Sequence, residues 1–486
     1  MEWLSLSTAW VAFVFLVDMT IRITSIMFVP PGRRPTSAMA WLLLIYFLPV
    51  PGVLFFLLIG NPRLPKKRRD IQAEVNQVLR DANEHLELGT LLPDPPEWFS
   101  SLVRMNRSLG ALPLSGDNGV RIISDYQASI DAMAEAVRRA EKYVHVEFYI
   151  LKADAATEPF FRALEDACSR GVAVRVLLDH WANLSKPLHG QTKERLEAMG
   201  ADWHLLLPLQ PLQRKFQRPD LRNHRKLVIV DGEVAFLGSQ NMTDPSYNVP
   251  RNIRRGLQWV DAMVRLDGPV VRSVDAVFLT DYYSETGIVP DGVDLARVSP
   301  GSDDYDCQVV PSGPGFEAEN NLLMFVSLLY AAQRKAIMVS PYFIPDEALM
   351  RAVTAACARG VEVELFVSET SDQAMVYHAQ RSYYEDLLRA GVRIWMYREP
   401  YILHTKSLSI DDETAVIGSS NMDMRSFGLN FEVSLLVRGG EFVEQLREVE
   451  QDYRTQSREL TLEEWAAQPL RSRVLDNLAR LTSALQ

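Results

Sequence analysis

The pattern of apolar and polar positions divides the 486-residue chain into an apolar N-terminal part and a longer, mixed part. Residues 3–17 carry no charge, and neither does any of the 28 residues from Pro35 to Pro62. A helix needs about 20 apolar residues to cross a bilayer. The pattern therefore predicts two transmembrane helices, at about residues 4–27 and 38–60, and the second is long enough to cross even with a kink at Pro49, Pro51 and Gly52.

Charged residues near these segments indicate how the chain is oriented. Asp18 and Arg22 interrupt the first segment, but they stand four positions apart and can pair on one face of a helix. The start Met1-Glu2 lacks the basic residues of a signal peptide. Basic residues are densest directly after the second segment, in residues 63–69. By the positive-inside rule, this predicts a multi-pass protein of the cell (inner) membrane whose catalytic, C-terminal part is cytoplasmic.

The chain changes character again after this membrane region, residues 1–62. Residues 63–119 are polar and loop-like, which predicts a basic juxtamembrane segment and linker. From there helix and strand patterns alternate in an order that occurs twice, and the phrases CSRGVAVRVLL and CARGVEVELFV align without a gap. The predicted fold class is α/β, with two duplicated lobes, residues 120–300 and 301–486, of largely parallel sheet about a pseudo-twofold axis.

The end of the second lobe predicts a C-terminal amphipathic helix. Apolar residues recur there at helical spacing with arginines among them: Val474, Leu478, Leu481, Leu485, Arg471, Arg473 and Arg480. Such a helix is suited either to lie in a membrane interface or to pack on the protein body, and the sequence leaves both open.

Composition narrows the classes of function. The formal charge of −11 and the pI near 5.4 disfavour non-specific binding of nucleic acid, which depends on cationic surface. The three cysteines, Cys168, Cys307 and Cys357, have no metal-binding spacing and are predicted to be small buried residues. No nucleic-acid partner is therefore expected.

Two stretches of nearly the same sequence carry the strongest functional signal. Residues 224–241 read HRKLVIVDGEVAFLGSQN, and residues 404–421 read HTKSLSIDDETAVIGSSN. Each has His, one residue, Lys, four residues, Asp, and then six residues before Gly-Ser-x-Asn. Five matching positions at one spacing, found twice, indicate a shared role.

The face on which each motif residue lies predicts what it does. Alternate side chains of a strand point to the same face, so His224 and Lys226 share one face and Asp231 takes the other. The second motif repeats this with His404, Lys406 and Asp411. Each His and Lys is predicted to meet a ligand together, and each Asp to hold the strand end and the local backbone.

Together the two motifs bring two imidazoles, two ammonium groups and two sets of neutral donors to one pocket. The neutral donors, which suit an oxyanion, are Ser239, Asn241, Ser419 and Asn421. This set fits a phosphodiester: one His attacks phosphorus, the other protonates the leaving alkoxide, and Lys and Asn hold the non-bridging oxygens. The lysines supply the charge that a metal would otherwise bring, so no metal or other cofactor is predicted.

Both stretches match the HKD motif of the phospholipase D superfamily, and longer runs resemble the bacterial cardiolipin synthases. The resemblance covers nearly the whole chain and is carried by RRPTSAMAWLL, DLRNHRKLVIVD, GSQNMTDPSY, PSGPGF, PYFIPD, LHTKS and NMDMRSFGLNFE. These runs are much longer and more specific than the motif alone.

The resemblance implies transfer of a phosphatidyl group at a membrane. One phosphatidylglycerol is attacked to give a phosphatidyl-histidine intermediate and free glycerol, and a second phosphatidylglycerol resolves it to cardiolipin. By superfamily analogy His224 is the nucleophile and His404 is the acid and base. An acidic residue downstream of each motif orients its histidine, and the first matching pair is Asp261 with His224. The second pair is Glu432 with His404.

Other readings of the same residues stay open. Water in place of a lipid alcohol would make the enzyme a phospholipase D or a nuclease, and another alcohol would make it a different transferase. A non-catalytic membrane scaffold that binds lipid is the alternative of a different class, and the intact His and Lys of both motifs weigh against it. The sequence does not determine the oligomeric state.

Overall fold

The computed structural model describes residues 2–33, 35–60, 70–71, 89–184, 188–210, 215–216, 218, 220–295, 299–316 and 319–481. The chain falls into two compact units. The first unit is Met1–Arg63 with Arg218–Asp220, and the second is Leu64–Gln217 with Leu221–Gln486. The basic cluster at residues 63–69 lies outside the described residues.

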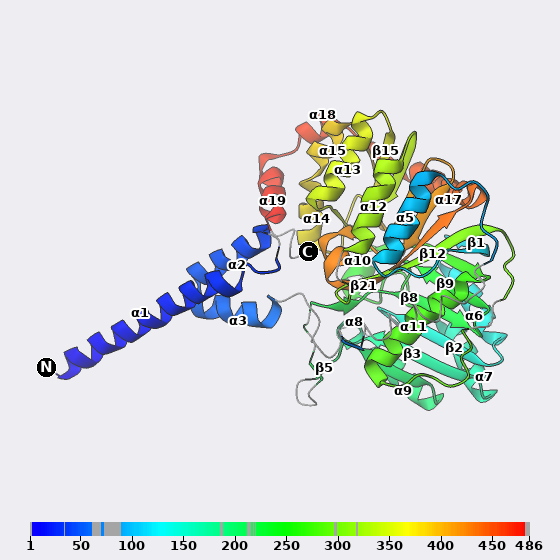
Figure 1. Ribbon diagram of the computed structural model, residues 1–486, viewed down its shortest axis with the longest axis horizontal. Coiled ribbons are helices and arrows are strands. Elements are labelled where there is room, and N and C mark those ends of the chain that lie inside the picture. Colours follow the sequence, from blue (N-terminus) through cyan, green and yellow to red (C-terminus); the bar gives the residue numbers. More distant parts are fainter. Residues whose placement is uncertain are drawn as a thin grey trace. The chain divides into compact units, whose positions relative to one another are not determined.

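The first unit begins with a long apolar helix, α1 (Glu2–Phe28) (Figure 1). Its stretch Trp10–Phe28 is the one described helix that is long and apolar enough to cross a membrane, judged by length and composition. Asp18 and Arg22 form the predicted ion pair, with 2.7 Å between Oδ2 and Nε. The charges of the helix thus neutralise each other on one face, which favours placing them among lipids.

The second predicted transmembrane helix is not confirmed, because two short helices lie where one long helix with a kink was predicted. They are α2 (Pro35–Phe47) and α3 (Pro49–Ile59). Leu48 between them has φ −132° and ψ 75°, outside the helical region, as expected for a residue that precedes a proline. Pro49 then begins α3, since proline suits the first position of a helix.

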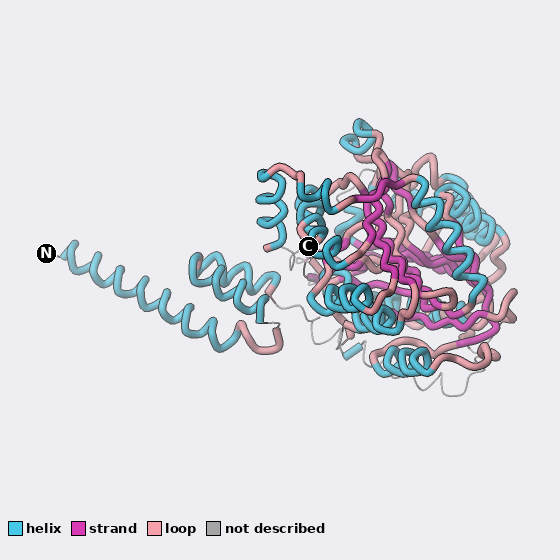
Figure 2. The backbone as a smooth tube through the Cα atoms, turned by 90° about the horizontal axis from the view of Figure 1, so that it is seen from above, coloured by secondary structure: helices cyan, strands magenta, loops and turns pink. Residues whose placement is uncertain are grey.

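Helices α2 and α3 fold back on each other as an antiparallel hairpin (Figure 2). The Arg33 guanidinium donates to the Gly60 carbonyl at 3.0 and 3.2 Å, so the two ends of the hairpin meet. Trp41 and Phe56 pack edge to face, with ring centroids 5.4 Å apart. Gly52 lies so close to Ile45 that a Cβ there would stand 2.8 Å from the Ile45 Cα. A larger residue at position 52 would push the helices apart.

The second unit is an α/β fold built on one mixed sheet of 16 strands. Helix α5 (Glu97–Ser108) comes first. The first half then contains β1 (Ser115–Ile123), α6 (Tyr126–Arg138), β2 (Tyr143–Phe148), α7 (Glu158–Ser169), β3 (Ala173–Asp179), α8 (His180–Leu184), α9 (His189–Ala198), β4 (Asp202–Leu206), β5 (Leu209–Gln210), β6 (Lys215–Phe216), β7 (Arg222–Asn223), β8 (Lys226–Val230), β9 (Val234–Gly238), α10 (Pro250–Arg255), β10 (Gln258–Val260), β11 (Met263–Asp267) and α11 (Val270–Thr286).

The second half repeats much of this order. It contains β12 (Tyr305–Ser312), α12 (Asn320–Ala331), β13 (Lys335–Val339), β14 (Phe343–Ile344), α13 (Glu347–Ala358), β15 (Glu362–Ser368), α14 (Ala374–Arg381), α15 (Tyr384–Ala390), β16 (Arg393–Tyr397), β17 (Tyr401–Leu403), β18 (Ser407–Ile410), β19 (Thr414–Gly418), β20 (Met422–Asp423), α16 (Met424–Gly428), β21 (Asn430–Arg438), α17 (Gly440–Thr455), β22 (Ser457–Leu460), α18 (Leu462–Ala466) and α19 (Leu470–Arg480).

The strand order is the same in both halves when each is read outward from the middle of the sheet, except that the second half has one further strand, β22, at its edge. It runs β22-β16-β15-β13-β18-β19-β21-β12 and then β1-β11-β9-β8-β2-β3-β4. Strands β12 and β1 pair antiparallel, so the halves share one sheet. The outer strands β2, β3 and β4, and likewise β13, β15 and β16, are parallel as predicted. The inner strands are antiparallel, because each motif turns back on itself as a hairpin, β8–β9 or β18–β19.

Helices cover both faces of the sheet (Figure 2). On one face, α11 and α17 pack over both halves, in a cluster that includes Leu227 and Ile229 of β8. On the other face, α6 and α7 pack on Val228 and Val230. Alternate residues of the first motif thus face opposite sides, as its pattern predicts.

Part of the segment predicted as a linker is folded on the second unit. Phe99 and Leu102 of α5 are buried in the core of the second half. Figure 1 shows α5 beside α12. Strand β1 begins at Ser115 and fills the centre of the sheet. The amphipathic spacing of α5 is the signal by which the sequence could have revealed this.

Candidate active site

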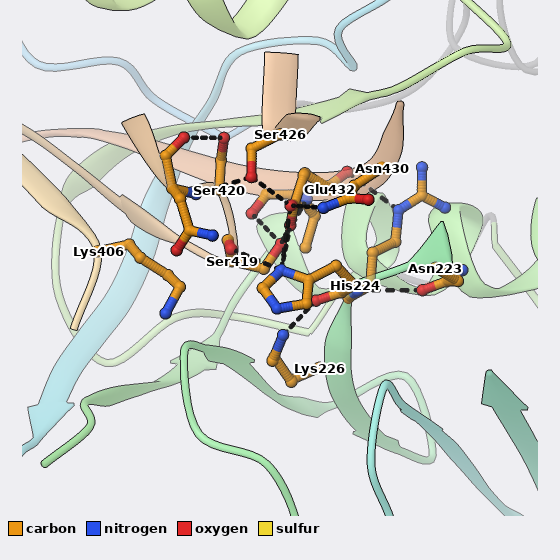
Figure 3. A network of polar contacts seen from close by, with 12 residues as sticks. Asn223, His224, Lys226, Lys406, Ser419, Ser420, Ser426, Asn430 and Glu432 are labelled. Atoms are coloured by element: carbon orange, nitrogen blue, oxygen red, sulfur yellow. Dashed lines mark hydrogen bonds and ion pairs between the residues drawn. The ribbon is translucent and has the colours of Figure 1, made fainter. Parts of the chain in front are cut away.

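His224 lies at the C-terminal edge of β2, directly before β8. The preceding strand β7 pairs in parallel with the start of β21 in the other half, and the His224 backbone N–H donates to Phe431 O at 2.8 Å. This pairing brings the His224 Nδ1 to 3.0 Å from each carboxylate oxygen of Glu432. Figure 3 shows Glu432 beside the Nδ1 side of the ring.

His404 is positioned in the same way at the C-terminal edge of β13. Strand β17 before it pairs in parallel with β10 of the first half, and the His404 backbone N–H donates to Val260 O at 2.7 Å. The His404 Nδ1 lies 2.7 Å from Asp261 Oδ1. Each histidine is therefore held by a carboxylate from the opposite half.

The predicted pairing of acids and histidines is therefore wrong, although the residues themselves are the right ones. Glu432 contacts His224, and Asp261 contacts His404. The reason is that β7–β21 and β10–β17 cross between the halves, so each histidine lies next to the strand of the other half. Spacing along the sequence carries no information about such long-range pairing.

The two lysines lie beside the histidines that their motifs predict. The Lys226 ammonium donates to the His224 carbonyl, and the Lys406 ammonium donates to the His404 carbonyl at 2.5 Å. Both lysines are buried. Burial lowers the pKa of Lys406 to about 8 and holds the pKa of Lys226 well below its ordinary value. The charge of each lysine also lowers the pKa of the other half's histidine, and His224 Nδ1 lies 3.1 Å from the Ser419 carbonyl of the second motif, so the two motifs lie close together.

The histidines are neutral at neutral pH. Burial lowers the pKa of His224 to about 4, against the opposing effect of Glu432. Burial lowers the pKa of His404 to about 4 in the same way, against the effect of Asp261. Since each Nδ1 faces a carboxylate, Nδ1 carries the proton and Nε2 presents a lone pair.

The aspartates of the motifs hold backbone, as predicted. Asp231 accepts from the backbone N–H groups of residues 141, 142 and 143 at 2.7–2.8 Å. Asp411 accepts from those of residues 333, 334 and 335, with best distances of 2.8–3.0 Å. Both residues have positive φ, 55° and 49°. They fix the hairpin turns that lead out of each motif and do not contact the histidines.

The serines of the Gly-Ser-x-Asn tails do not serve as the predicted oxyanion donors. Ser239 Oγ donates to Asp261 Oδ1, and Ser419 Oγ donates to Glu432 Oε2, both at 2.6 Å. Both serines are fully buried. Each serine therefore orients the carboxylate that orients a histidine, one step further from the reacting atoms than predicted.

The asparagines of the tails differ from each other. Both polar atoms of the Asn241 side chain have a partner, because Nδ2 donates one hydrogen to the Tyr247 hydroxyl at 2.8 Å and Oδ1 accepts from the Ile150 N–H at 3.1 Å. The second Nδ2 hydrogen is left for another acceptor, so the role of Asn241 as an oxyanion donor stays a prediction. The Asn421 amide oxygen has no hydrogen-bond partner within the described part of the chain.

Three further residues of the site escaped the sequence analysis. Ser426 Oγ and Asn430 Nδ2 donate to Glu432 Oε1 at 2.9 and 3.4 Å (Figure 3). The ring of Tyr149 meets the His224 ring edge to face, with centroids 4.9 Å apart. Ser426 and Asn430 lie in NMDMRSFGLNFE, so that run could have indicated them. Nothing comparable marks Tyr149.

The described residues offer little for a metal ion. Within the ranges that the structure covers, no group of three or more His, Cys, Asp or Glu side chains is arranged to hold one. Positive charge beside the histidines comes from Lys226 and Lys406.

This fold and this paired site define a protein of the phospholipase D-like class. Residues 133–255 and 325–453 match the family described as "Cardiolipin synthase, PLD-like domain", and residues 19–61 match "Phospholipase_D-nuclease N-terminal". More narrowly, the chain belongs to the family of cardiolipin synthases within that class.

Relatives over the full length support this placement. The chain is 30% identical to cardiolipin synthase A of Proteus mirabilis (strain HI4320) over 490 residues, which cover 98% of each chain. It is 32% identical to cardiolipin synthase A of Yersinia pseudotuberculosis serotype O:1b (strain IP 31758) over 491 residues, 100% of this chain and 98% of the relative. The crystal structure of phosphatidylserine synthase from Haemophilus influenzae Rd KW20 shares the fold, with a TM-score of 0.60 at 13% identity over 79% of this chain and 100% of that one.

Proposed function

We propose that the protein is a membrane-bound cardiolipin synthase, a phosphatidyltransferase that uses phosphatidylglycerol as both donor and acceptor. The observation that carries this proposal is the pair of His–Lys motifs, each completed by a carboxylate from the opposite half. Full-length similarity to cardiolipin synthases supports the choice of lipid substrates. The repeated motif and strand order support an origin of the two halves by duplication.

In the first step, His224 acts as the nucleophile. Its neutral Nε2 attacks phosphorus of the first phosphatidylglycerol, a P–N bond forms, and the P–O bond to the glycerol headgroup breaks. His404, as the imidazolium, gives its proton to the departing glycerol oxygen. The bound phosphate anion favours that protonated form, because a nearby negative charge raises the pKa of a histidine. Glu432 stabilises the positive charge that develops on His224.

In the second step, the same groups work in reverse. Neutral His404 removes the proton from a terminal hydroxyl of the second phosphatidylglycerol, and that oxygen attacks phosphorus. The P–N bond breaks, His224 regains its lone pair, and cardiolipin is released. Lys226 and Lys406 place positive charge beside the phosphate oxygens through both steps.

The carboxylates support this division of roles. Glu432 accepts from Ser419, Ser426 and Asn430 besides His224, so its charge is shared among several donors. Asp261 accepts from Ser239 and His404, and its Oδ2 has no partner among the described residues. A carboxylate with fewer donors stabilises an imidazolium more strongly. His404 is thus better suited to carry the proton, and His224 to attack.

The reaction products test the proposal. Purified full-length enzyme given phosphatidylglycerol alone should release glycerol and form cardiolipin in equal molar amounts. Phosphatidic acid as the main product would instead identify a hydrolase. His224→Ala and His404→Ala variants that remain folded should lose turnover, and retained turnover in both would leave a lipid-binding scaffold as the better description.

We also propose that the catalytic unit faces the cytoplasm, since the basic residues 63–69 follow the hairpin. The ends of the α2–α3 hairpin meet, so one crossing by α1 places the N-terminus on the outer side. In intact cells, an impermeant thiol reagent should label Ser5→Cys and leave Thr36→Cys unlabelled. The reverse labelling would indicate a second crossing.

A further inference from the structure

The C-terminal helix α19 presents its apolar side to solvent. Its outward residues follow one face at a spacing of three or four, as expected from about 3.6 residues per turn. Their exposed fractions are 75% for Leu470, 49% for Val474, 57% for Leu478 and 82% for Leu481, which follows the helix directly. The usual arrangement of a surface helix, with its apolar face against the core, is reversed here.

The inward side of α19 is held by polar contacts. Asp476 is buried, and its Oδ1 lies 2.7 Å from His378 Nδ1 of α14. Both Asp476 oxygens accept from Arg381 Nε at 3.3 Å. The Arg381 guanidinium also packs over the Trp465 ring, 4.8 Å from its centroid. Because these contacts fix the helix, the apolar stripe is not needed to hold it on the body.

The outward side of α19 is also basic. Arg471 and Arg473 are exposed beside the apolar stripe, whereas the acid of this helix, Asp476, faces inward. This contrasts with the chain as a whole, whose formal charge is −11. A leucine-rich stripe flanked by arginines is complementary to a bilayer with anionic headgroups.

The helix lies at the edge of the sheet where the histidines are. Helix α14, on which α19 packs, follows the C-terminal end of β15. Strand β15 is parallel to β13, and His404 lies at the C-terminal end of β13. Asp372, just before α14, accepts from the Tyr342 hydroxyl at 3.1 Å, and Tyr342 follows β13. The exposed stripe therefore borders the catalytic edge of the unit.

We propose that α19 docks on an anionic membrane surface through Leu470, Val474, Leu478 and Leu481. Arg471 and Arg473 contact the headgroups, and the His378–Asp476–Arg381 contacts keep the stripe facing out. Docking turns the catalytic edge toward the lipid from which substrate is drawn. This last step rests on the proposed function, whereas docking itself does not.

Activity measurements test the consequence for catalysis. Full-length Val474→Asp/Leu478→Asp enzyme is compared with wild type in vesicles of phosphatidylcholine that contain long-chain phosphatidylglycerol. The variant should be slower by about tenfold or more, because two exposed apolar side chains that docking would bury in the lipid are replaced by charge. In phosphatidylcholine vesicles given dispersed short-chain phosphatidylglycerol, the rates should be equal. Equal losses on both substrates, or no loss on the first, would overturn the proposal.

A matched control lies elsewhere on the same unit. Ile288 and Val289 follow α11 and are exposed by 59% and 72%. The Ile288→Asp/Val289→Asp enzyme carries the same change in charge and should keep wild-type rates on both substrates. A loss equal to that of the α19 variant would attribute the effect to charge alone and contradict docking.

A fluorescence measurement tests docking without any turnover. Leu478→Cys, in a variant with its native cysteines replaced by alanine, carries an environment-sensitive probe; Ile288→Cys is the control. Nitroxide-labelled lipids in phosphatidylglycerol vesicles should quench the probe at 478 and not at 288, and Arg471→Glu/Arg473→Glu should reduce the quenching. An unquenched probe at 478 overturns docking. A change in probe fluorescence that follows the amount of protein per vesicle, and not the nitroxide-labelled lipid, also overturns it, because it indicates contact between copies of the protein. If quenching occurs in an enzyme that makes no cardiolipin, the proposed function fails and docking stands.

Discussion

His224 and His404 each contact, through Nδ1, a carboxylate from the opposite half of the sheet, but the two carboxylates have different surroundings. Both Glu432 oxygens are engaged, Oε1 by Ser426 and Asn430 and Oε2 by Ser419, besides their contacts with His224. Asp261 uses one oxygen for both Ser239 and His404. The two motifs differ little in sequence, so the difference between the two histidines comes from the residues that surround Glu432 and Asp261.

The comparison shows how one repeated motif can serve two roles. A carboxylate that accepts many hydrogen bonds holds its histidine firmly but has less charge to offer an imidazolium. The shorter contact of 2.7 Å at His404, against 3.0 Å at His224, agrees with this. Among the described residues, an aromatic ring, that of Tyr149, packs against His224, and none is seen against His404. Orientation is thus favoured at His224 and proton binding at His404.

The largest expected effect comes from removing each histidine in turn. His224→Asn and His404→Asn should each lower kcat by about 10³-fold or more, since attack and proton transfer both need an imidazole. Only the His404→Asn enzyme should carry a phosphatidyl group, because it keeps the nucleophile. The group should form slowly, since the acid for the leaving glycerol is lost, and should persist, since the base that activates the acceptor is lost too. Mass spectrometry of each variant after exposure to labelled phosphatidylglycerol measures this.

The opposite labelling would exchange the roles. If the phosphatidyl group is found on His404 in the His224→Asn enzyme, then His404 is the nucleophile. Intact wild-type-like circular dichroism in both variants is the control for folding.

The carboxylates should differ in how they tolerate an amide. Asp261→Asn can turn its NH₂ toward the side that has no partner and keep its carbonyl on His404, so we expect about a 10²-fold loss of kcat. In Glu432→Gln the NH₂ must replace one of two oxygens that both accept hydrogen bonds, so a donor meets a donor in either orientation. We therefore expect about a 10³-fold loss of kcat and a loss of about 2 kcal/mol in the free energy of unfolding. Steady-state rates and thermal unfolding measure both. Equal losses of activity and stability would show that the surroundings of the two carboxylates do not matter.

The sequence predicts the residues of this site better than their partners. Local features, such as the alternation in HRKLVIVD and the turn at each Asp, depend on neighbouring residues and are confirmed at Asp231 and Asp411. The partners of the histidines depend on strands that are far apart in the sequence. Asp261 and His404 are separated by 143 residues, and His224 and Glu432 by 208. No local pattern encodes such pairing.

The membrane region also shows what a local sequence pattern cannot predict. An uncharged stretch of 28 residues has the length of a crossing, but Leu48 before Pro49 leaves the helical region and reverses the chain. The outward stripe of α19 is likewise visible in the sequence as amphipathic spacing. His378 and Arg381 determine which side of α19 faces the protein, because they bind Asp476. They precede Asp476 by 98 and 95 residues, so no local pattern shows these contacts.

The lysines of the two halves should set the alkaline limit of activity. Burial lowers the pKa of Lys406 to about 8, so its charge is present below that pH and is lost as the pH rises through it. In the complex with substrate, where the bound phosphate favours protonated His404, kcat should fall about tenfold per pH unit as this charge is lost above about pH 8. On the acid side the rate should hold to about pH 5, because the pKa of His224 is about 4. Rates on short-chain phosphatidylglycerol between pH 5 and 10 measure this; a flat profile up to pH 9.5 contradicts it.

The smallest effect, and the one in which the halves should agree, concerns the motif aspartates. Asp231 and Asp411 each accept three backbone N–H groups at positive φ. Asparagine tolerates that φ but offers fewer acceptor positions, so Asp231→Asn and Asp411→Asn should each cost about 1–2 kcal/mol of stability. Activity at low temperature should change by no more than a few fold, since neither side chain contacts a histidine. Thermal unfolding of the two variants beside wild type measures the cost. A large loss of activity in one variant alone would show that its aspartate has a direct part in the reaction, and would extend the difference between the halves from the carboxylates behind the histidines to the motifs themselves.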